Sequence, residues 1–199
     1  ASELVRETRA LLAAGMGGRA PEELLALLEH PDRRVRQEAH FALAERGDVG
    51  RLTWTAVNPG KPLVARLHAV WALGIRARTR SEWSGLLEVV QSNGQNVVNT
   101  GRPSADTTEV RAQAIRLLGD ARSAEAAPLA VTMLADPSPR VRFFAALAAG
   151  RLGARGATPS LAQLLRDAGT TDTNLRHAAV MGLVGCASEK ELETLASDP

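Results

Sequence analysis

Aromatic side chains and isoleucine are scarce in this chain of 199 residues. Phenylalanine, tryptophan and tyrosine make up 3% of the sequence, tyrosine is absent, and isoleucine occurs only at Ile75 and Ile115. Strands are normally enriched in aromatic and β-branched residues, so this composition excludes a large β-sheet. The 45% of hydrophobic residues are therefore mainly alanine, leucine and valine. Alanine and leucine are strong helix formers, which favours an all-α fold.

Motifs that would carry chemistry are missing as well. Cys186 is the only cysteine, so there is no internal disulfide framework and no Cys-x-x-Cys-His motif for covalent haem attachment. The sequence also lacks a His-Glu-x-x-His zinc motif and a Gly-x-Ser-x-Gly nucleophile elbow. The glycine-rich stretch 15–18 follows a predicted helix and lacks the lysine and hydroxyl of a phosphate loop. We predict a helix end and linker there, and no catalytic, cofactor-binding or metal-binding residue in this chain.

Charge gives little reason to expect nucleic acid or membrane as a partner. The formal net charge is +2, and only Lys61 and Lys190 are lysines among 24 cationic residues. No run of like charge reaches the length of a basic tail. The densest cationic cluster, Arg76, Arg78 and Arg80, is expected at a helix end, where cations complement the helix dipole. No signal peptide opens the chain and no apolar stretch is long enough to cross a bilayer, so we predict no membrane insertion.

One local pattern recurs five times along the chain. An arginine is followed three residues later by alanine and seven residues later by leucine or alanine. The arginines are Arg36, Arg66, Arg111, Arg142 and Arg176. Their spacings are 30, 45, 31 and 34 residues, a period typical of stacked copies of one supersecondary unit.

Each repeat is predicted to be a first helix, a tight turn and a second helix. At Pro31 and Pro137 the proline ends an apolar helical run, and a Val-Arg pair follows within five residues. First helices are predicted near 21–29, 49–57, 80–91, 123–135 and 158–168, and second helices near 32–46, 62–76, 107–119, 139–152 and 172–185. Residues 3–14 form another predicted second helix. The expected helix caps are Asp32, Ser138, Asp172 and either Asp106 or Thr107.

Two segments depart from the regular period. Residues 92–106 are polar and rich in turn formers, and they predict a long inserted loop that is either a tolerated insertion or a partner contact. Residues 195–199 match the turn at 134–137, so helix 188–197 would lack a second helix after it. We therefore treat 1–199 as a single repeat domain and expect it to be a piece of a longer protein.

Histidine and tryptophan are the remaining candidate site residues. No histidine has another histidine four residues away, and no carboxylate cluster accompanies them, so packing is expected rather than metal binding. The alternative is a partner-binding surface that includes His40, His68, Trp71 and His177. Trp54 and Trp83, with Glu82 as the nearest acid, leave open a base-binding site of the alkylpurine DNA glycosylase type.

The Val-Arg pairs and the aspartate or proline turns before them resemble HEAT repeats, in the short form seen in phycobilisome-lyase-type HEAT proteins. The resemblance implies an all-α, right-handed α-solenoid of about five HEAT-like helix pairs. It also implies that Arg36, Arg66, Arg111, Arg142 and Arg176 form a structural ladder, bonding turn carboxylates and carbonyls of neighbouring repeats.

A closer resemblance rests on HPDRRVRQEAHFALAERG (30–47), ARLHAVWALG (65–74) and LRHAA (175–179). These segments are similar to the HEAT region of PVC-type haem-binding proteins, large bacterial proteins that join a β-propeller, a HEAT array and a c-type haem domain. The resemblance implies a non-catalytic scaffold that positions other domains or binds a protein, within an exported, haem-containing redox protein. A nucleic-acid-binding HEAT protein and a chromophore-lyase-type subunit are the alternatives.

Overall fold

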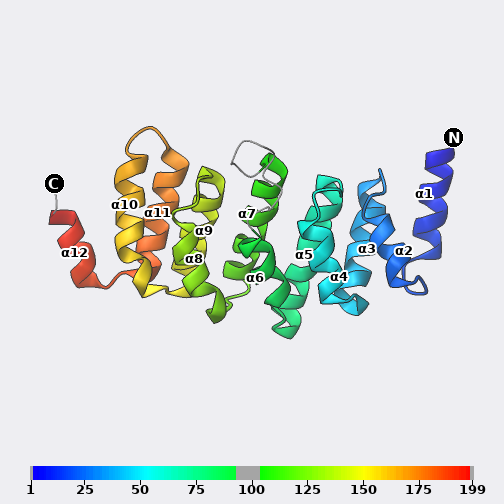
Figure 1. The fold of residues 1–199 in the computed structure, drawn as a ribbon, viewed down its shortest axis with the longest axis horizontal. Helices are drawn as coiled ribbons and strands as arrows, with labels where there is room; N and C mark the ends of the chain where they lie inside the picture. Colours follow the sequence, from blue (N-terminus) through cyan, green and yellow to red (C-terminus); the bar gives the residue numbers. More distant parts are fainter. Residues whose placement is uncertain (1, 93–103, 198–199) are drawn as a thin grey trace. The chain divides into compact units, whose positions relative to one another are not determined.

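The structure, a computed structural model, describes residues 2–92 and 104–197, and every regular element within these two ranges is helical (Figure 1). Clustering of the backbone contacts divides the chain into two compact units, Ala1–Val110 and Arg111–Pro199. Each unit is described by itself. Residues 93–103 of the predicted 92–106 loop lie outside the described ranges.

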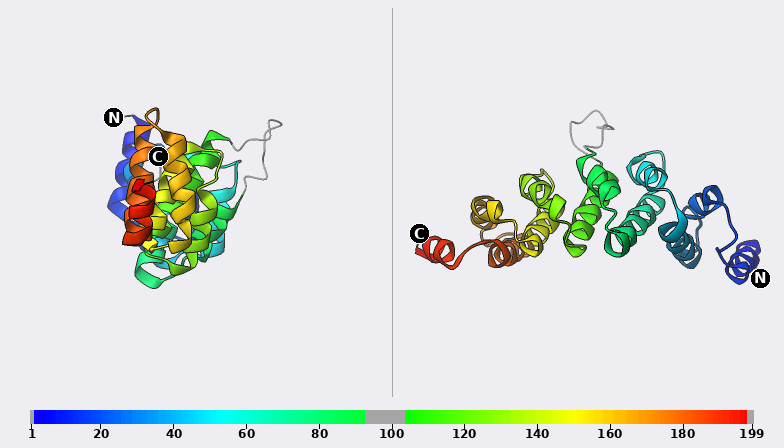
Figure 2. Two further views of the ribbon diagram at one scale, coloured as in Figure 1. Left: turned by 90° about the vertical axis from the view of Figure 1, so that its left-hand side faces the viewer. Right: turned by 90° about the horizontal axis from the view of Figure 1, so that it is seen from below.

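Unit 1 is a stack of helix pairs. Its helices are α1 (Glu3–Ala14), α2 (Pro21–Leu27), α3 (Arg33–Arg46), α4 (Val49–Val57), α5 (Leu63–Arg80), α6 (Ser84–Gln91) and the first turn of α7 (Ala105–Asp120). The first helices α2 and α4 pack on the second helices α3 and α5, respectively, and α3 also packs on α5. The two rows of helices can be followed within this unit in the right-hand view of Figure 2.

Unit 2 repeats the same arrangement. After α7 come a 3-10 turn (Ala124–Ala126), α8 (Ala127–Met133), α9 (Pro139–Leu152), a second 3-10 turn (Arg155–Ala157), α10 (Thr158–Ala168), α11 (Thr173–Cys186) and α12 (Glu189–Ser197). Here α8 packs on α9, α10 on α11, and the second helices α9 and α11 form the most extensive contact. The predicted all-α solenoid of helix pairs is confirmed, while its right-handed sense stays a prediction.

The core follows the register of the repeated arginine. The residue before the arginine and the alanine three positions after it lie on the same side of each second helix. All five of these alanines are fully buried: Ala39, Ala69, Ala114, Ala145 and Ala179. Small side chains at this position allow the two helices of a repeat to pack closely.

Glycines bring the backbones of α9 and α11 into direct contact. A Cβ placed on Gly182 would lie 2.9 Å from the carbonyl oxygen of Ala146, and one placed on Gly185 would overlap the carbonyl oxygen of Gly150. A Cβ on Gly150 would lie 2.8 Å from the carbonyl oxygen of Met181. Because real Cβ atoms do not approach this closely, the spacing of these helices requires glycine on both sides.

The predicted helix caps are partly correct. Asp32 accepts a hydrogen bond from the Arg34 N–H at 2.8 Å, and Asp172 accepts one from the Leu175 N–H at 2.9 Å. Ser138 precedes α9 as predicted, but its side chain makes no capping hydrogen bond.

Asp106 and Thr107 do not cap the helix that was predicted to start near residue 107. Helix α7 already begins at Ala105, and the hydroxyl of Ser104 accepts a hydrogen bond from the Thr107 N–H at 3.1 Å. The cap is Ser104, two residues before the earlier of the two predicted candidates.

Two predicted boundaries around Arg76 are wrong. Helix α5 continues to Arg80 instead of ending near residue 76, and α6 begins at Ser84 instead of residue 80. The extra turn is held by neighbouring chain: Arg76 donates to the Ala44 carbonyl oxygen at 3.0 Å and pairs with Glu82, and Arg80 donates to the Glu45 carbonyl oxygen at 2.8 Å. Arg76 is therefore a buried link between α3 and α5, while Arg78 and Arg80 occupy the last turn as predicted. The predicted helix 123–135 is a 3-10 turn followed by the shorter α8.

Two of the repeated arginines bind the turn of their own repeat. Arg36 donates through Nη1 to the carbonyl oxygens of His30 and Pro31, at 2.7 and 2.8 Å. Arg142 donates in the same way to the carbonyl oxygens of Asp136 and Pro137, at 2.8 and 3.3 Å. These bonds tie each second helix to the turn of its own repeat, whereas the predicted ladder joins neighbouring repeats; Arg36 also donates through Nε to Nε2 of His68 in the next repeat.

Arg66 and Arg111 reach the next repeat as well, whereas Arg176 has no acceptor among the described residues. Arg66 donates to the Ala56 carbonyl oxygen at 2.8 Å in its own repeat and to Thr107 of α7 at 3.4 Å. Arg111 pairs with Asp136 in the following turn at 2.7 Å. Arg176 is exposed, and no described residue accepts a hydrogen bond from its side chain.

We expect Arg111→Ala to be strongly destabilising. The Arg111 and Asp136 side chains are 4% and 3% exposed, so removing the arginine leaves a buried carboxylate without its counter-ion. Breaking a buried pair in this way costs about 3–5 kcal/mol. Denaturant unfolding should show this loss, whereas Arg176→Ala, which removes an exposed arginine, should change the unfolding free energy little. Equal effects of the two variants would contradict the structural role of Arg111.

We also expect Gly185→Ala to lower the unfolding free energy, by about 1–3 kcal/mol, because α9 and α11 must move apart to admit the methyl group. Gly156→Ala is the matched control, since a Cβ at Gly156 meets no atom within 4 Å. Thermal unfolding of both variants measures the difference. If the Gly185 variant is as stable as the Gly156 variant, the close helix contact does not limit stability.

Candidate functional site

Two buried histidines from neighbouring repeats face each other in unit 1. His40 lies on α3 and His68 on α5, and their Nδ1 atoms are 2.9 Å apart. The packing of α3 on α5 places the two rings in contact, with centroids 5.0 Å apart. At this distance the two nitrogens share one hydrogen bond, so one ring must donate and the other must accept.

Arg36 determines which histidine is the donor. Its Nε donates to Nε2 of His68 at 3.2 Å, so this nitrogen carries no proton. The proton of neutral His68 is therefore on Nδ1, which donates to Nδ1 of His40. His40 in turn carries its proton on Nε2. The chain from Arg36 to His68 to His40 fixes both tautomers and the orientation of both rings.

Aromatic rings extend this chain to the protein surface. Trp71, on α5, packs edge to face with His68 at a centroid distance of 4.8 Å and lies 6.3 Å from His40. Phe41 packs edge to face with His40 at 4.4 Å, and 42% of its surface is exposed. We call Phe41, His40, His68 and Trp71 the aromatic–histidine cluster.

Burial keeps both histidines neutral. Desolvation lowers the pKa of His40 to about 4. Desolvation also lowers the pKa of His68 to about 4, with smaller effects from the nearby His40, Arg36 and Arg33. An efficient general acid or base has a pKa near the working pH, so these rings are poorly suited to proton transfer at neutral pH. They are suited to holding neighbouring side chains in place.

The predicted partner residues are thus divided between the units. His40, His68 and Trp71 lie together in the cluster, whereas His177 is exposed on α11 in unit 2. The histidine pair was not predicted from the sequence because the two residues are 28 positions apart. They also stand at different offsets, four and two residues, after their repeated arginines. Only the side-by-side packing of α3 and α5 brings them together.

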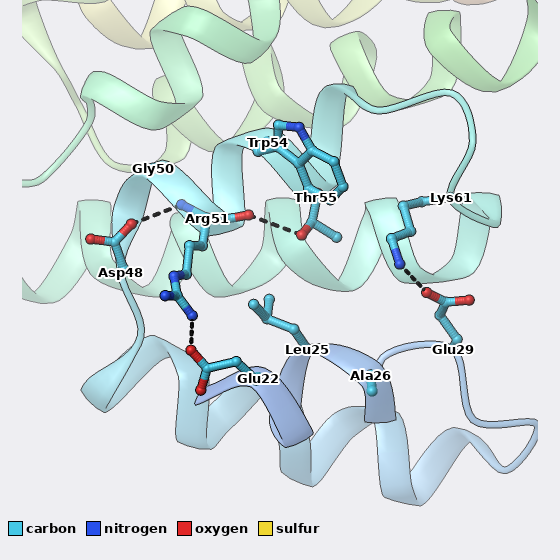
Figure 3. A pocket seen from close by; sticks show the side chains of 10 residues that line it. All are labelled: Glu22, Leu25, Ala26, Glu29, Asp48, Gly50, Arg51, Trp54, Thr55 and Lys61. Atoms are coloured by element: carbon cyan, nitrogen blue, oxygen red, sulfur yellow. Dashed lines mark hydrogen bonds and ion pairs between the residues drawn. The ribbon is translucent and has the colours of Figure 1, made fainter. Parts of the chain in front are cut away.

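A groove of about 680 Å³ lies between the first helices α2 and α4 of unit 1 (Figure 3). Leu25 and Ala26 of α2 lie on one side, and Trp54 of α4, 57% exposed, lies on the other. An ion pair stands towards each end of the groove. These pairs are Arg51 with Glu22, and Lys61 with Glu29 at 2.6 Å.

The charges in this groove are satisfied by one another. The hydrogen bond from Arg51 lowers the pKa of Glu22, which keeps that carboxylate ionised and paired. Asp48 accepts a hydrogen bond from the Arg51 N–H at 2.8 Å and caps α4. The ion pairs connect consecutive repeats across the groove. Their arrangement explains how α2 and α4 are held beside each other, and leaves no charged group directed at a ligand.

Trp54 lies on α4, and Trp83 precedes α6, which packs on α4. No ring contact joins the two tryptophans within the described part of the chain. Glu82, the nearest acid, is paired with Arg76 at 2.6 Å. The base-binding alternative stays a prediction.

The remaining features concern metal ions, membranes and the single cysteine. No group of three or more histidine, cysteine, aspartate or glutamate side chains there is placed to hold a metal ion. None of the helices in the described ranges is both long and apolar enough to pass through a bilayer.

Cys186 is buried, and burial raises the pKa of its thiol. Its Sγ lies 3.2 Å from the Ala149 carbonyl oxygen. Gly15 has a positive φ of 69° at the end of α1, as expected for a helix end.

We expect stability to fall as the pH is lowered from about 6.5 to 4. In the unfolded chain His40 and His68 bind protons near pH 6.5, but in the folded protein each has a pKa of about 4. The unfolded state therefore binds more protons in this window, which costs up to about 2 kcal/mol per histidine between pH 7 and pH 5. Urea unfolding at these two pH values measures the loss.

The matched variant is His40→Gln combined with His68→Gln. This variant should be less stable than the wild type at pH 7. Its unfolding free energy should change much less between pH 7 and pH 5, because the two titrating groups are gone. Carboxylates titrate mainly below this window. An unchanged pH dependence in the double variant would show that the histidine pair is not the cause.

The comparisons with known proteins agree with the helix-pair architecture. Residues 103–184 match the family model described as HEAT repeats. No curated protein matches the chain, so the closer resemblance to PVC-type haem-binding proteins stays a prediction. HEAT repeats are typically non-catalytic helical scaffolds for protein interaction. Residues 103–184 are thus similar to HEAT repeats, and the helix pairs α8–α9 and α10–α11 in this range fit that architecture.

Proposed function

We propose that this chain is a non-catalytic binding scaffold, which holds a protein partner or another domain against the aromatic–histidine cluster. The observation that carries the proposal is Phe41, a phenylalanine with 42% of its surface exposed on a second helix. Aromatic residues are enriched in protein interfaces, and those that dominate binding energy are usually held rigidly.

The surroundings of Phe41 support this role. Its ring packs on His40, and His40 is fixed by the hydrogen bond to His68. Arg36 anchors His68 to the turn before α3 through the His30 and Pro31 carbonyl oxygens. The side chain is therefore positioned before any partner arrives, which reduces the entropy that binding would cost.

The groove between α2 and α4 supports binding less well, although it contains the more exposed Trp54. The Arg51–Glu22 pair joins α4 to α2, and the Lys61–Glu29 pair joins the segments that follow these helices, so a partner would gain little from replacing them. Trp54 also has no ring contact that would fix its orientation among the described residues.

The wider setting belongs to the same proposal. The segments 30–47 and 65–74 support a role as a spacer in an exported, haem-containing redox protein, where other domains of the polypeptide would be the partners. Nucleic-acid binding and a chromophore-lyase role are not favoured by any specific contact among the described residues.

The test uses peptides as surrogate partners. A displayed library of random peptides is selected on the chain, and the dissociation constants of the enriched peptides are measured for the wild type, Phe41→Ala and Trp54→Ala. We expect Phe41→Ala to weaken binding about tenfold or more, as for a central interface aromatic, and Trp54→Ala to have little effect.

Two results would contradict the proposal. Enriched peptides that depend on Trp54 and not on Phe41 would place binding in the groove of the first helices. A selection without enrichment would argue against peptide binding by this chain. Because Phe41 is partly exposed, its variant is expected to remain folded, and circular dichroism checks this.

A further inference from the structure

The second helices share a surface that is defined by the repeated arginine. The residues one, four, five and eight positions after the arginine lie on one side of the helix, and we call this side the forward face. In α9 the forward face packs against α11, where Ala146 and Gly150 meet the backbone of Met181 and Gly182. The forward face of α11 consists of His177, Val180, Met181 and Val184.

Burial distinguishes α11 from the second helices before it. The residue four positions after the arginine is buried in each of the four earlier helices: His40, Val70, Ile115 and Ala146. The corresponding residue of α11, Val180, is 41% exposed, and its neighbours Met181 and Val184 are 46% and 65% exposed. Three adjacent apolar side chains on one helix face are thus open to solvent.

Val184 shows that this face is not built to receive a further second helix at the usual spacing. The residue eight positions after the arginine is small in each of the four earlier helices: Ala44, Gly74, Gly119 and Gly150. Even a Cβ at Gly150 would come within 2.8 Å of the Met181 carbonyl oxygen, and valine adds two further carbons. A helix that packs on Val184 must therefore lie farther from α11 than α9 does.

We propose that the occupant is α11 of a second copy of this chain, packed antiparallel to the first. Residues spaced by three, four and seven positions form the contact stripe of ordinary helix pairs, which lie about 8–10 Å apart. A two-fold axis between Val180 and Met181 brings Val180 of each copy onto Met181 of the other, and His177 onto Val184. The surface is self-complementary, as an isologous dimer contact requires.

Charge supports the antiparallel direction. Arg176 is exposed and has no acceptor among the described residues. The antiparallel arrangement places it opposite residue 185 of the second copy, in the last turn of α11, and Glu189 begins α12 three residues after the end of that helix. Glu191 already accepts hydrogen bonds from Ser188, whereas Glu189 is an exposed carboxylate at the helix start. The two copies would therefore form two symmetric Arg176–Glu189 pairs.

The experiment is sedimentation velocity over a series of protein concentrations. We expect a reversible dimer of the wild-type chain, and Val184→Asp should weaken the association at least tenfold because it places a carboxylate in the apolar contact. Val64→Asp is the matched control, since Val64 is a similarly exposed valine, 42%, on α5 in unit 1. This control should dimerise as the wild type does.

A charge exchange tests the direction of packing. Arg176→Glu should weaken the dimer, and the combination of Arg176→Glu with Glu189→Arg should restore it. A wild-type chain that stays monomeric at the highest concentration overturns the proposal. So does a dimer that Val184→Asp leaves intact, or one that Val64→Asp disrupts equally. A dimer lost in Val184→Asp but unaffected by the charge exchange overturns the antiparallel arrangement.

Discussion

The structure depends on how closely consecutive second helices approach one another. In unit 2 the contact between α9 and α11 is made by backbone atoms, because Gly150, Gly182 and Gly185 have no side chain to separate them. The alanines at the third position after each arginine are fully buried as well and add small side chains to the core. A chain with few aromatic residues can therefore form a core from small side chains, provided that the helices lie close together.

Arginines of the second helices bind polar groups of the turns. Arg36 and Arg142 donate to carbonyl oxygens of the turns, and the buried Arg111 pairs with the carboxylate of Asp136. In unit 1 the same device positions a binding surface, since Arg36 connects the turn to His68 and so to the ring that supports Phe41. Fold stability and the proposed function share these residues.

The sequence predicted the positions of the helices, which depend on patterns within a single repeat. The period of the arginines, the prolines in the turns and the capping aspartates place the helices within a few residues of their observed ends. What it did not predict depends on contacts between repeats. Helix α5 runs to Arg80 because its last turn binds carbonyl oxygens of α3. Arg36 and Arg142 bind carbonyl oxygens of their own turns, and Arg36 also donates to His68 of the next repeat. The histidine pair arises from unequal offsets in neighbouring repeats, which no single-repeat pattern contains.

The central claim is that a rigid row of second helices presents the aromatic–histidine cluster. Amide hydrogen exchange measures this rigidity directly, because exchange from a tightly packed helix requires its local unfolding. The account predicts slow exchange in α3 and α5 around His40 and His68, and fast exchange in α12, none of whose residues is buried. Amides of α3 and α5 that exchange as fast as those of α12 would contradict it.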